Sequence, residues 1–195
     1  MTVNNPLISF LRRHIDISEK HSVLILKNTY VKEYTPLDFF FEKDQKNDRI
    51  AFVISGVFRS YFRDKEGNEI TSNFIKENEI VGDAVSFQLN SDRTQENIYI
   101  QAETYCKVVV FSKESRDQIS NLIPNWESGF QKIITEILLT QINFQRSIIN
   151  LNAKDSYLLF MKSNPTILQY ISLNHLATYL GITATSLSRI RKDLF

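Results

Sequence analysis

The C-terminal segment from Ile171 to Phe195 constrains the fold most, because its apolar residues predict two short helices joined by a tight corner. Apolar residues recur there at spacings of three and four, which places them on one helical face. That first face consists of Leu173, Leu176, Ala177 and Leu180. Gly181 follows, and glycine readily adopts the left-handed conformation that ends a helix. Thr183 can cap a second helix. The expected buried face of that second helix comprises Leu187, Ile190 and Leu194.

The opposite side of the second helix carries polar and basic residues, as expected of a helix that enters the major groove of DNA. Such a helix needs side chains that reach base edges and cations that contact phosphates. The residues assigned to base edges are Thr185, Ser188 and Arg189, and Ala184 lies on the same DNA-facing side. The residues assigned to phosphate contacts are Ser172, Thr183, Arg191 and Lys192. The alternative is a helical hairpin whose basic end only offsets the helix dipole.

Composition indicates a folded, intracellular protein. Hydrophobic residues make up 43% of the chain and aromatic residues 12%, which is ample for a packed core and argues against disorder. No apolar run approaches the length of a membrane span, so we expect no membrane partner. The first residues lack the basic start and long apolar stretch of a signal peptide. Cys106 is the single cysteine, which excludes an intramolecular disulfide and favours a cytoplasmic location.

The distribution of charge is more informative than its total. The net charge is only +1, yet the segment from Leu151 onward carries five cations against two acids. A modest positive bias therefore lies where we place the DNA contact. It is too small for strong binding by one copy, so we expect two copies to act together.

A pattern typical of antiparallel strands runs from Thr29 to about Ser112. Short stretches rich in Val, Ile, Phe and Tyr are separated by Gly, Asn and Asp, which favour turns. The predicted strands are 30–34, 39–41, 50–55, 57–63, 69–75, 97–102 and 106–111. Two short helices are predicted before them, at 6–14 and 18–27. This spacing predicts an α+β chain whose N-terminal part is an antiparallel β-roll of the jelly-roll type.

A long helix is predicted from Pro124 or Trp126 to Asn150. Its apolar residues alternate steps of four and three, a heptad seam that favours pairing with an identical helix. The seam residues assigned to a homodimer contact are Phe130, Ile134, Ile137, Gln141, Phe144 and Ile148. The residues beside the seam that we expect to pack on the roll are Ile133, Leu138, Ile142 and Ile149. The alternative is a helix buried wholly within its own domain.

The order of a β-roll, a long paired helix and a C-terminal helix-turn-helix resembles the Crp/Fnr family. The most specific stretch is Tyr179–Lys192, which is similar to the form found in short regulators of the Bacteroidetes branch. The resemblance implies a homodimeric transcription regulator whose partners are double-stranded DNA and RNA polymerase. It divides the chain into a cyclic-nucleotide-binding-like sensor roll at 1–123, a dimerisation helix at 124–151 and a helix-turn-helix domain at 152–195.

The resemblance also implies an effector site, where this chain departs from the family pattern. Members that bind cyclic nucleotides carry a glycine–glutamate pair and, further along, an arginine followed by serine or threonine. Here the pair is Gly82-Asp83, and counting forward from it reaches Arg93-Thr94. Counting back from strand 99–102 instead places Glu96-Asn97 at that point. An arginine can bind a phosphate bidentately, whereas a glutamate repels it. We therefore expect no tight cyclic-AMP binding, and either another small-molecule effector or none.

Enzyme signatures are missing from the sequence. The three histidines, His14, His21 and His175, lack partners at metal-ligand spacing, and we expect His175 to pack or to bond the backbone. The five glycines form no phosphate-binding loop. Cys106 is expected to be a small core residue. We therefore expect no enzymatic activity, no metal and no resident cofactor. The competing interpretations are a ligand-binding or protein-interaction module of the same fold that does not bind DNA, and a β-roll enzyme.

Overall fold

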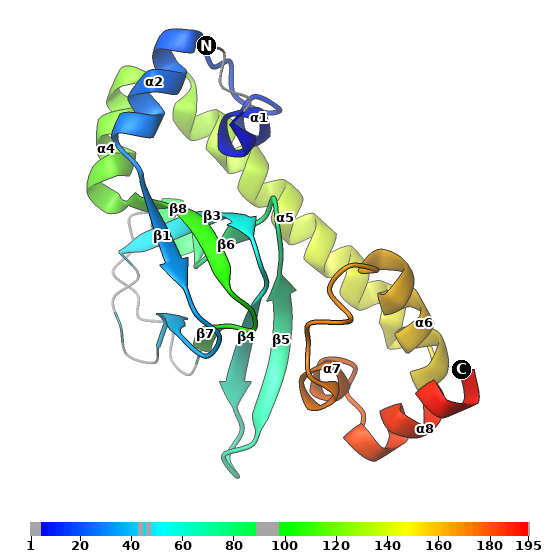
Figure 1. Cartoon of the computed structure of the whole chain (residues 1–195). Helices are drawn as coiled ribbons and strands as arrows, with labels where there is room; N and C mark the ends of the chain where they lie inside the picture. The colour runs from blue at the N-terminus through cyan, green and yellow to red at the C-terminus, as the bar shows by residue number, and fades with distance from the viewer. Residues whose placement is uncertain (1–4, 43–44, 46–47, 89–97, 195) are drawn as a thin grey trace.

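A computed structural model describes residues 5–42, 45, 48–88 and 98–194, and shows a β-roll joined by a long helix to a C-terminal group of helices (Figure 1). The chain begins with helices α1 (Pro6–Leu11) and α2 (Glu19–Lys27). The strands are β1 (Tyr30–Tyr34), β2 (Phe39–Phe41), β3 (Arg49–Ser55), β4 (Phe58–Arg63), β5 (Glu69–Ile75), β6 (Ile80–Val81), β7 (Ile98–Ala102) and β8 (Cys106–Ser112). The other helices are α3 (Ala84–Gln88), α4 (Lys113–Leu122), α5 (Trp126–Ile149), α6 (Ala153–Ser163), α7 (Leu173–Tyr179) and α8 (Ala184–Leu194).

The roll consists of two antiparallel sheets packed face to face, with strand orders β1-β8-β3-β6 and β2-β7-β4-β5. The first sheet is fixed by the register of β3 on β8, in which Phe52 lies opposite Val109. Successive side chains of a strand point to opposite faces. Ala51 and Val53 therefore face the interior of the roll, whereas Ile50 and Phe52 face the surrounding helices. The central strands β3 and β8 are thus buried on both sides, whereas the edge strand β1 is mostly exposed.

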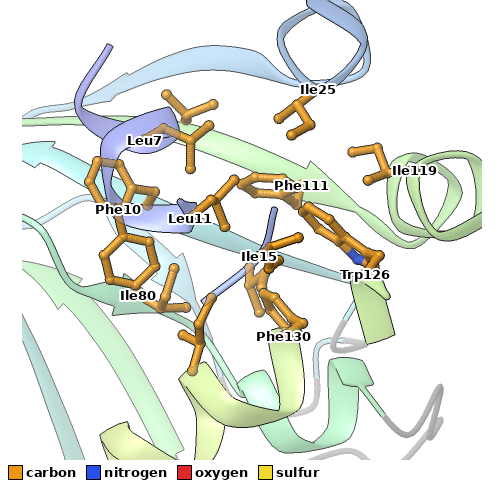
Figure 2. Close-up of a cluster of buried hydrophobic side chains, with 14 of the residues drawn as sticks. Leu7, Phe10, Leu11, Ile15, Ile25, Ile80, Phe111, Ile119, Trp126 and Phe130 are labelled. Atoms are coloured by element: carbon orange, nitrogen blue, oxygen red, sulfur yellow. The ribbon is translucent and has the colours of Figure 1, made fainter. Parts of the chain in front are cut away.

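The outer face of the first sheet is covered by α1, α2, α4 and α5 through apolar contacts, and we call it the Trp126 face (Figure 2). The rings of Trp126 and Phe130 stack with centroids 6.0 Å apart, and Phe111 of β8 lies beside Trp126. Gly129 permits this close packing, because a Cβ there would lie 2.4 Å from Cγ1 of Ile15. Burial of large aromatic side chains supplies most of the stabilisation of such a contact.

The outer face of the second sheet is covered in part by α7, which lies against β5, and we call it the Thr71 face (Figure 1). Two apolar residues of the roll, Val57 just before β4 and Phe74 in β5, join the core of the C-terminal helices. The ring of Phe74 lies 5.3 Å from that of Tyr179 and 6.0 Å from that of Phe160, measured between centroids. Polar contacts of α7 with this face include the pairs Thr71–Thr178 and Glu103–His175.

Helix α5 turns part of its predicted dimer seam toward its own chain. Phe130 and Ile134 are only 3% and 7% exposed, inside the cluster of the Trp126 face. Ile137 packs against the same cluster, and Phe144 stacks on Tyr179 at a centroid distance of 5.8 Å. The dimer assignment is wrong for Phe130 and Ile134, because a side chain buried in its own protomer leaves no surface for a partner. Of the other seam residues, Gln141 is exposed and Ile148 is half-buried.

Of the apolar residues that we expected to pack on the roll, one is buried and three are exposed. Ile133 is buried as predicted. Leu138, Ile142 and Ile149 are instead 42%, 41% and 74% exposed, together with Leu139 at 53%. That expectation is wrong for these residues, because two apolar stripes run along α5 and periodicity does not show which one faces inward.

The predicted strands are confirmed to within about one residue at each end, apart from Asn97, which lies outside the described residues. The short strand β6 and the helices α3 and α4 were not predicted. Helix α4 has a single buried apolar residue, Ile119, so it carries no periodic apolar stripe. The first helix ends at Leu11, earlier than predicted.

Candidate nucleic-acid interface

The terminal helix pair, α7 and α8, is joined through a left-handed glycine, as the sequence predicts. Gly181 has a φ of 68°, which glycine adopts without a steric penalty. Ser172 Oγ accepts a hydrogen bond of 3.1 Å from the backbone N–H of His175, which caps α7. Thr183 Oγ1 accepts one of 3.1 Å from the backbone N–H of Ser186 at the start of α8. Both helix starts are therefore fixed by local side-chain contacts.

Helix α8 is anchored by its inner side and exposes its outer side. Leu187 is completely buried, and Ile190 and Leu194 pack against the same cluster. The residues assigned to DNA that are exposed are Ser172, Thr183, Thr185, Ser188, Arg189, Arg191 and Lys192. Ala184 is half-buried against the cluster. The predicted base-reading row is thus free of packing contacts apart from Ala184.

The outer side of α8 ends in positive charge. Arg191 and Lys192 lie in its last turn, and Arg189 precedes them on the exposed side. Among the residues that the structure describes, none of these three cations forms an ion pair. Cations without intramolecular partners are available to phosphate oxygens. The surface therefore combines hydroxyl groups, an arginine and further cations on one rigid helix.

Helix α7 contacts a buried ionic cluster on the Thr71 face that the sequence analysis did not predict. Nδ1 of His175 lies 2.6 Å from Oε1 of Glu103, so this histidine contacts a carboxylate and not the backbone. The same carboxylate oxygen lies 3.2 Å from Nε of Arg59, whose side chain is 1% exposed. Arg59 also donates a hydrogen bond to Glu69. Partial burial by itself raises the pKa of Glu69, but the hydrogen bonds and charges of Arg59 and Arg63 outweigh it and lower that pKa.

Two further polar contacts join the C-terminal helices to β5. The backbone N–H of Thr71 donates to Oγ1 of Thr178 over 3.2 Å, and the two hydroxyl oxygens are 2.9 Å apart. Nζ of Lys76 donates to Oδ1 of Asn164, just after α6, over 2.6 Å. Sequence alone offered no signal for these pairs, because their members lie far apart in the chain and follow no motif.

The structure describes only two of the predicted effector residues, Gly82 and Asp83. Gly82 has a φ of 115°, and a Cβ there would meet Cγ2 of Ile50 at 3.1 Å, so packing and backbone conformation already require glycine. Asp83 is half-buried before α3, and its carbonyl accepts a hydrogen bond from the backbone N–H of Phe87. Arg93 and Thr94 lie outside the described residues, as does the alternative Glu96.

The interior of the roll is filled by aromatic side chains. Tyr34, Phe40 and Phe58 are buried, with ring centroids 5.5 to 6.0 Å apart. Cys106 is also buried there, as predicted, and burial raises the pKa of its thiol. Polar groups border these rings, since the Tyr34 hydroxyl is buried and the guanidinium carbon of Arg49 lies 5.5 Å from the centroid of the Phe40 ring.

The described ranges contain neither a cluster of metal ligands nor a membrane-spanning helix. No group of three or more His, Cys, Asp or Glu side chains in those ranges is arranged to hold a metal ion. Within the same ranges, no helix combines the length and apolar character needed to cross a bilayer.

Comparison with known proteins identifies the class of fold. Residues 31–121 match the family model of the cyclic nucleotide-binding domain. No curated protein matches the chain. Among solved structures, the c-di-GMP responsive global regulator CLP of Xanthomonas campestris is similar with a TM-score of 0.69 and 16% identity, over 91% of each chain.

Two other structures are similar over most of the chain. FixK2 of Bradyrhizobium japonicum has a TM-score of 0.69 and 15% identity, over 85% of this chain and 84% of FixK2. A protein of Eubacterium rectale described as a putative transcriptional regulator of the Crp/Fnr family has a TM-score of 0.65 and 16% identity, over 92% of this chain and 84% of that one. The chain therefore has the α+β fold of these regulators, with a cyclic-nucleotide-binding-like roll.

Proposed function

We propose that this protein is a homodimeric, sequence-specific DNA-binding transcription regulator of the Crp/Fnr type. The observation that carries the proposal is the exposed outer side of α8, held in place by the completely buried Leu187. A helix anchored on one side with free hydroxyls and cations on the other is suited to the major groove. The similar folds of CLP and FixK2 support this function. The narrower Bacteroidetes-type likeness and a contact with RNA polymerase stay predictions.

Within this proposal the residues of α8 have distinct tasks. Thr185, Ser188 and Arg189 read base edges, with Arg189 directed to a guanine. Arg191 and Lys192 bind phosphates, together with the hydroxyl groups at the starts of α7 and α8. Phosphate contacts give affinity, whereas base contacts give specificity.

The test begins with selection of bound fragments from genomic DNA, followed by binding measurements at matched salt. Arg189→Ala is expected to weaken the selected site by about 1–3 kcal/mol and to relax one base position. Lys192→Ala is expected to weaken all sequences alike and to reduce the salt dependence. Lys20→Ala removes the same charge from the exposed side of α2 and serves as the control. Unaltered footprints of Arg189→Ala would contradict the proposed role of α8.

The dimer contact is proposed on the outward apolar stripe of α5, which replaces the predicted seam. Leu138, Leu139, Ile142 and Ile149 are exposed on the C-terminal half of this helix. Exposed apolar stripes of this kind commonly bind a second helix. Two-fold symmetry would present two α8 helices about 34 Å apart, one turn of DNA.

Ile142→Asp tests the dimer, since a charge on the stripe would be desolvated on pairing. We expect a monomer in sedimentation equilibrium and a loss of affinity for a two-half-site fragment. Asn143→Asp introduces the same charge at the exposed neighbouring position and is expected to leave the dimer intact. If Ile142→Asp remains dimeric, the contact lies elsewhere.

The effector is proposed not to be cyclic AMP. Support comes from Asp83, which is shorter than glutamate, and from the aromatic filling of the roll around Phe40 and Phe58. Calorimetry with cyclic AMP and with c-di-GMP, to which CLP responds by its description, addresses this directly. Micromolar cyclic-AMP binding that disappears in Arg93→Ala would overturn this proposal.

A further inference from the structure

Two hydrogen-bond donors inside the roll lack acceptors among the described residues. The hydroxyl of Tyr34, a residue only 2% exposed, and Nε of Arg49 are both buried, and neither forms a hydrogen bond there. The two side chains are neighbours, but arginine carries only donors and cannot accept the hydroxyl hydrogen. Burial raises the pKa of Tyr34 and outweighs the opposing charge of Arg49, so the hydroxyl stays protonated. Buried donors without acceptors are rare in folded proteins and require an explanation, such as a bound ion or water.

The guanidinium of Arg49 lies at the boundary between the roll interior and solvent. Its Nη2 donates to the carbonyl of Phe40 over 2.9 Å, and its carbon lies 5.5 Å from the centroid of the Phe40 ring. Its Nη1 pairs over 2.8 Å with the exposed carboxylate of Asp48. Asp48 therefore offsets part of the charge from the solvent side, while Nε stays without a partner inside. The Arg49 side chain is 25% exposed, so a small solute can reach it.

A second cation lies beside these donors. Nζ of Lys32 is 4.7 Å from the centroid of the Tyr34 ring, and it forms no ion pair within the described part of the chain. The carboxylate of Asp38 is exposed and already accepts hydrogen bonds from Thr35. Two cations and two donors without acceptors favour a negatively charged ligand, and hydrogen bonds to such a ligand are strong.

The ligand must be small, because aromatic rings occupy the space next to these donors. The rings of Tyr34, Phe40 and Phe58 are buried, with centroids 5.5 to 6.0 Å apart. A nucleoside would have to displace these rings from a closely packed interior. A carboxylate or phosphate group requires only the donors at their edge.

We propose that Arg49 and Tyr34 form a binding site for a small oxyanion, a carboxylate or a phosphate, at the edge of the roll interior. The cation is supplied by the first residue of β3 instead of Arg93, to which the family resemblance points. The carbonyl of Arg49 is 3.2 Å from the position that a Cβ of Gly82 would take, so the site lies beside the Gly82-Asp83 segment. The inference gives the effector a chemical class, and only that role rests on the proposed function.

The test is thermal unfolding of the whole chain, titrated with inorganic phosphate or with acetate at constant ionic strength set by chloride. We expect a saturable rise in Tm with at least one probe, because a ligand that binds only the folded state stabilises it. The probe that produces the rise identifies the group that is bound. Tyr34→Phe and Arg49→Gln should each weaken that binding at least about tenfold, since each removes a hydrogen bond to a charged ligand.

Two matched substitutions serve as controls. Tyr105→Phe removes a hydroxyl that contacts Glu33 at an exposed position. Arg13→Gln removes an exposed arginine that, like Arg49, lies over a phenylalanine ring and donates to the carbonyl of that residue, here Phe10. Both variants should bind the anion as the wild type does.

The ligand-free protein gives a readout that distinguishes a binding hydroxyl from a structural one. Removal of a buried hydroxyl without an acceptor should leave Tm unchanged or raise it, whereas removal of a bonded hydroxyl lowers it. Tyr34→Phe should therefore keep or raise the Tm of the ligand-free protein and lose the rise caused by the anion. This variant decides the question even if Arg49→Gln fails to fold.

Several results would overturn the site. They are the absence of a saturable rise with either probe, a rise that chloride reproduces, and unchanged affinity in Tyr34→Phe. A lower Tm of ligand-free Tyr34→Phe would assign the hydroxyl to the packing of the roll and would also overturn it. None of these measurements involves DNA, so failure of the anion site leaves the proposed DNA-binding function standing. Failure to retain any DNA fragment would refute that function and leave the anion site standing.

Discussion

The two outer faces of the roll are covered by helices in contrasting ways. The Trp126 face holds α1, α2, α4 and α5 through a continuous apolar cluster that includes stacked aromatic rings (Figure 2). The Thr71 face holds α7 through one hydroxyl pair, an ionic cluster and two apolar side chains. When an apolar face opens, the stabilisation from its buried surface is lost without replacement. When a polar face opens, its groups form hydrogen bonds with water instead. The comparison therefore indicates one permanent attachment and one that can open.

Removal of the Trp126 indole should have the largest effect on stability, because this ring lies at the centre of the Trp126 face. Trp126→Ala is expected to lower the free energy of unfolding by about 3–5 kcal/mol, because it leaves a cavity between Phe111 and Phe130. Urea denaturation followed by circular dichroism measures this loss. Leu122→Ala, at a 58% exposed position of α4, should change it by less than about 0.5 kcal/mol. A loss for Trp126→Ala as small as that of this control would contradict the division between the faces.

Overpacking of the same face should have an intermediate effect. Gly129→Ala places a Cβ 2.4 Å from Cγ1 of Ile15 and 3.0 Å from the carbonyl of His14, and is expected to cost about 1–3 kcal/mol. Combination with Ile15→Ala should cost less than the sum of the two changes, because the clash is relieved. Ser128→Ala, at the exposed neighbouring position, provides the baseline for urea denaturation. Strict additivity would show that α5 moves away from the N-terminal segment at no cost.

A polar change on the Thr71 face should cost less and act locally. Thr178→Val removes the hydroxyl that contacts Thr71 and is expected to cost about 1 kcal/mol. Hydrogen exchange should accelerate in α7 and β5 while the amides of α1 keep their protection. Thr140→Val, on an exposed part of α5, is the matched substitution. Equal acceleration on both faces would mean that they open together.

A half-buried carboxylate, that of Glu79, should give the smallest effect on stability, and this effect depends on pH. Burial raises the pKa of Glu79 above its value of 4.5 in the unfolded chain, so its ionisation disfavours the folded state. This contribution to stability is fully present below pH 4.5 and is lost as the pH rises through the folded-state pKa. Glu79→Gln should therefore raise the melting temperature at neutral pH and give no gain near about pH 4. A gain of the same size at both pH values would assign the effect to packing.

The fold was largely predictable because its elements carry local signals. The strands alternate or cluster apolar residues between turn residues, and the glycine corner at Gly181 lies within one motif. Helix α4 was missed because only Ile119 is buried, which leaves no periodic pattern. The two stripes of α5 were predicted, but Phe130 is buried and Ile142 is exposed, because only tertiary packing decides which stripe faces the roll.

The candidate site was predictable on one side only. The exposed row from Thr185 to Arg189 follows from helical periodicity, since Leu187 fixes which side is buried. The cluster of Arg59, Glu103 and His175 was not predictable, because its members come from separate elements that are brought together by the fold. The sequence does not show whether a single charged residue in a strand is exposed or forms an ion pair.

The continuity of α5 has a mechanical consequence. Its first turns are fixed among the aromatic rings of the Trp126 face, and Phe144 near its other end stacks on Tyr179 of α7. A helix of 24 residues is about 36 Å long, so a tilt of about 5° at its fixed end moves the far end by about 3 Å. Such a displacement is comparable to a whole hydrogen-bond length. A small rearrangement near Trp126 is therefore amplified along this rigid rod to the helices at its other end.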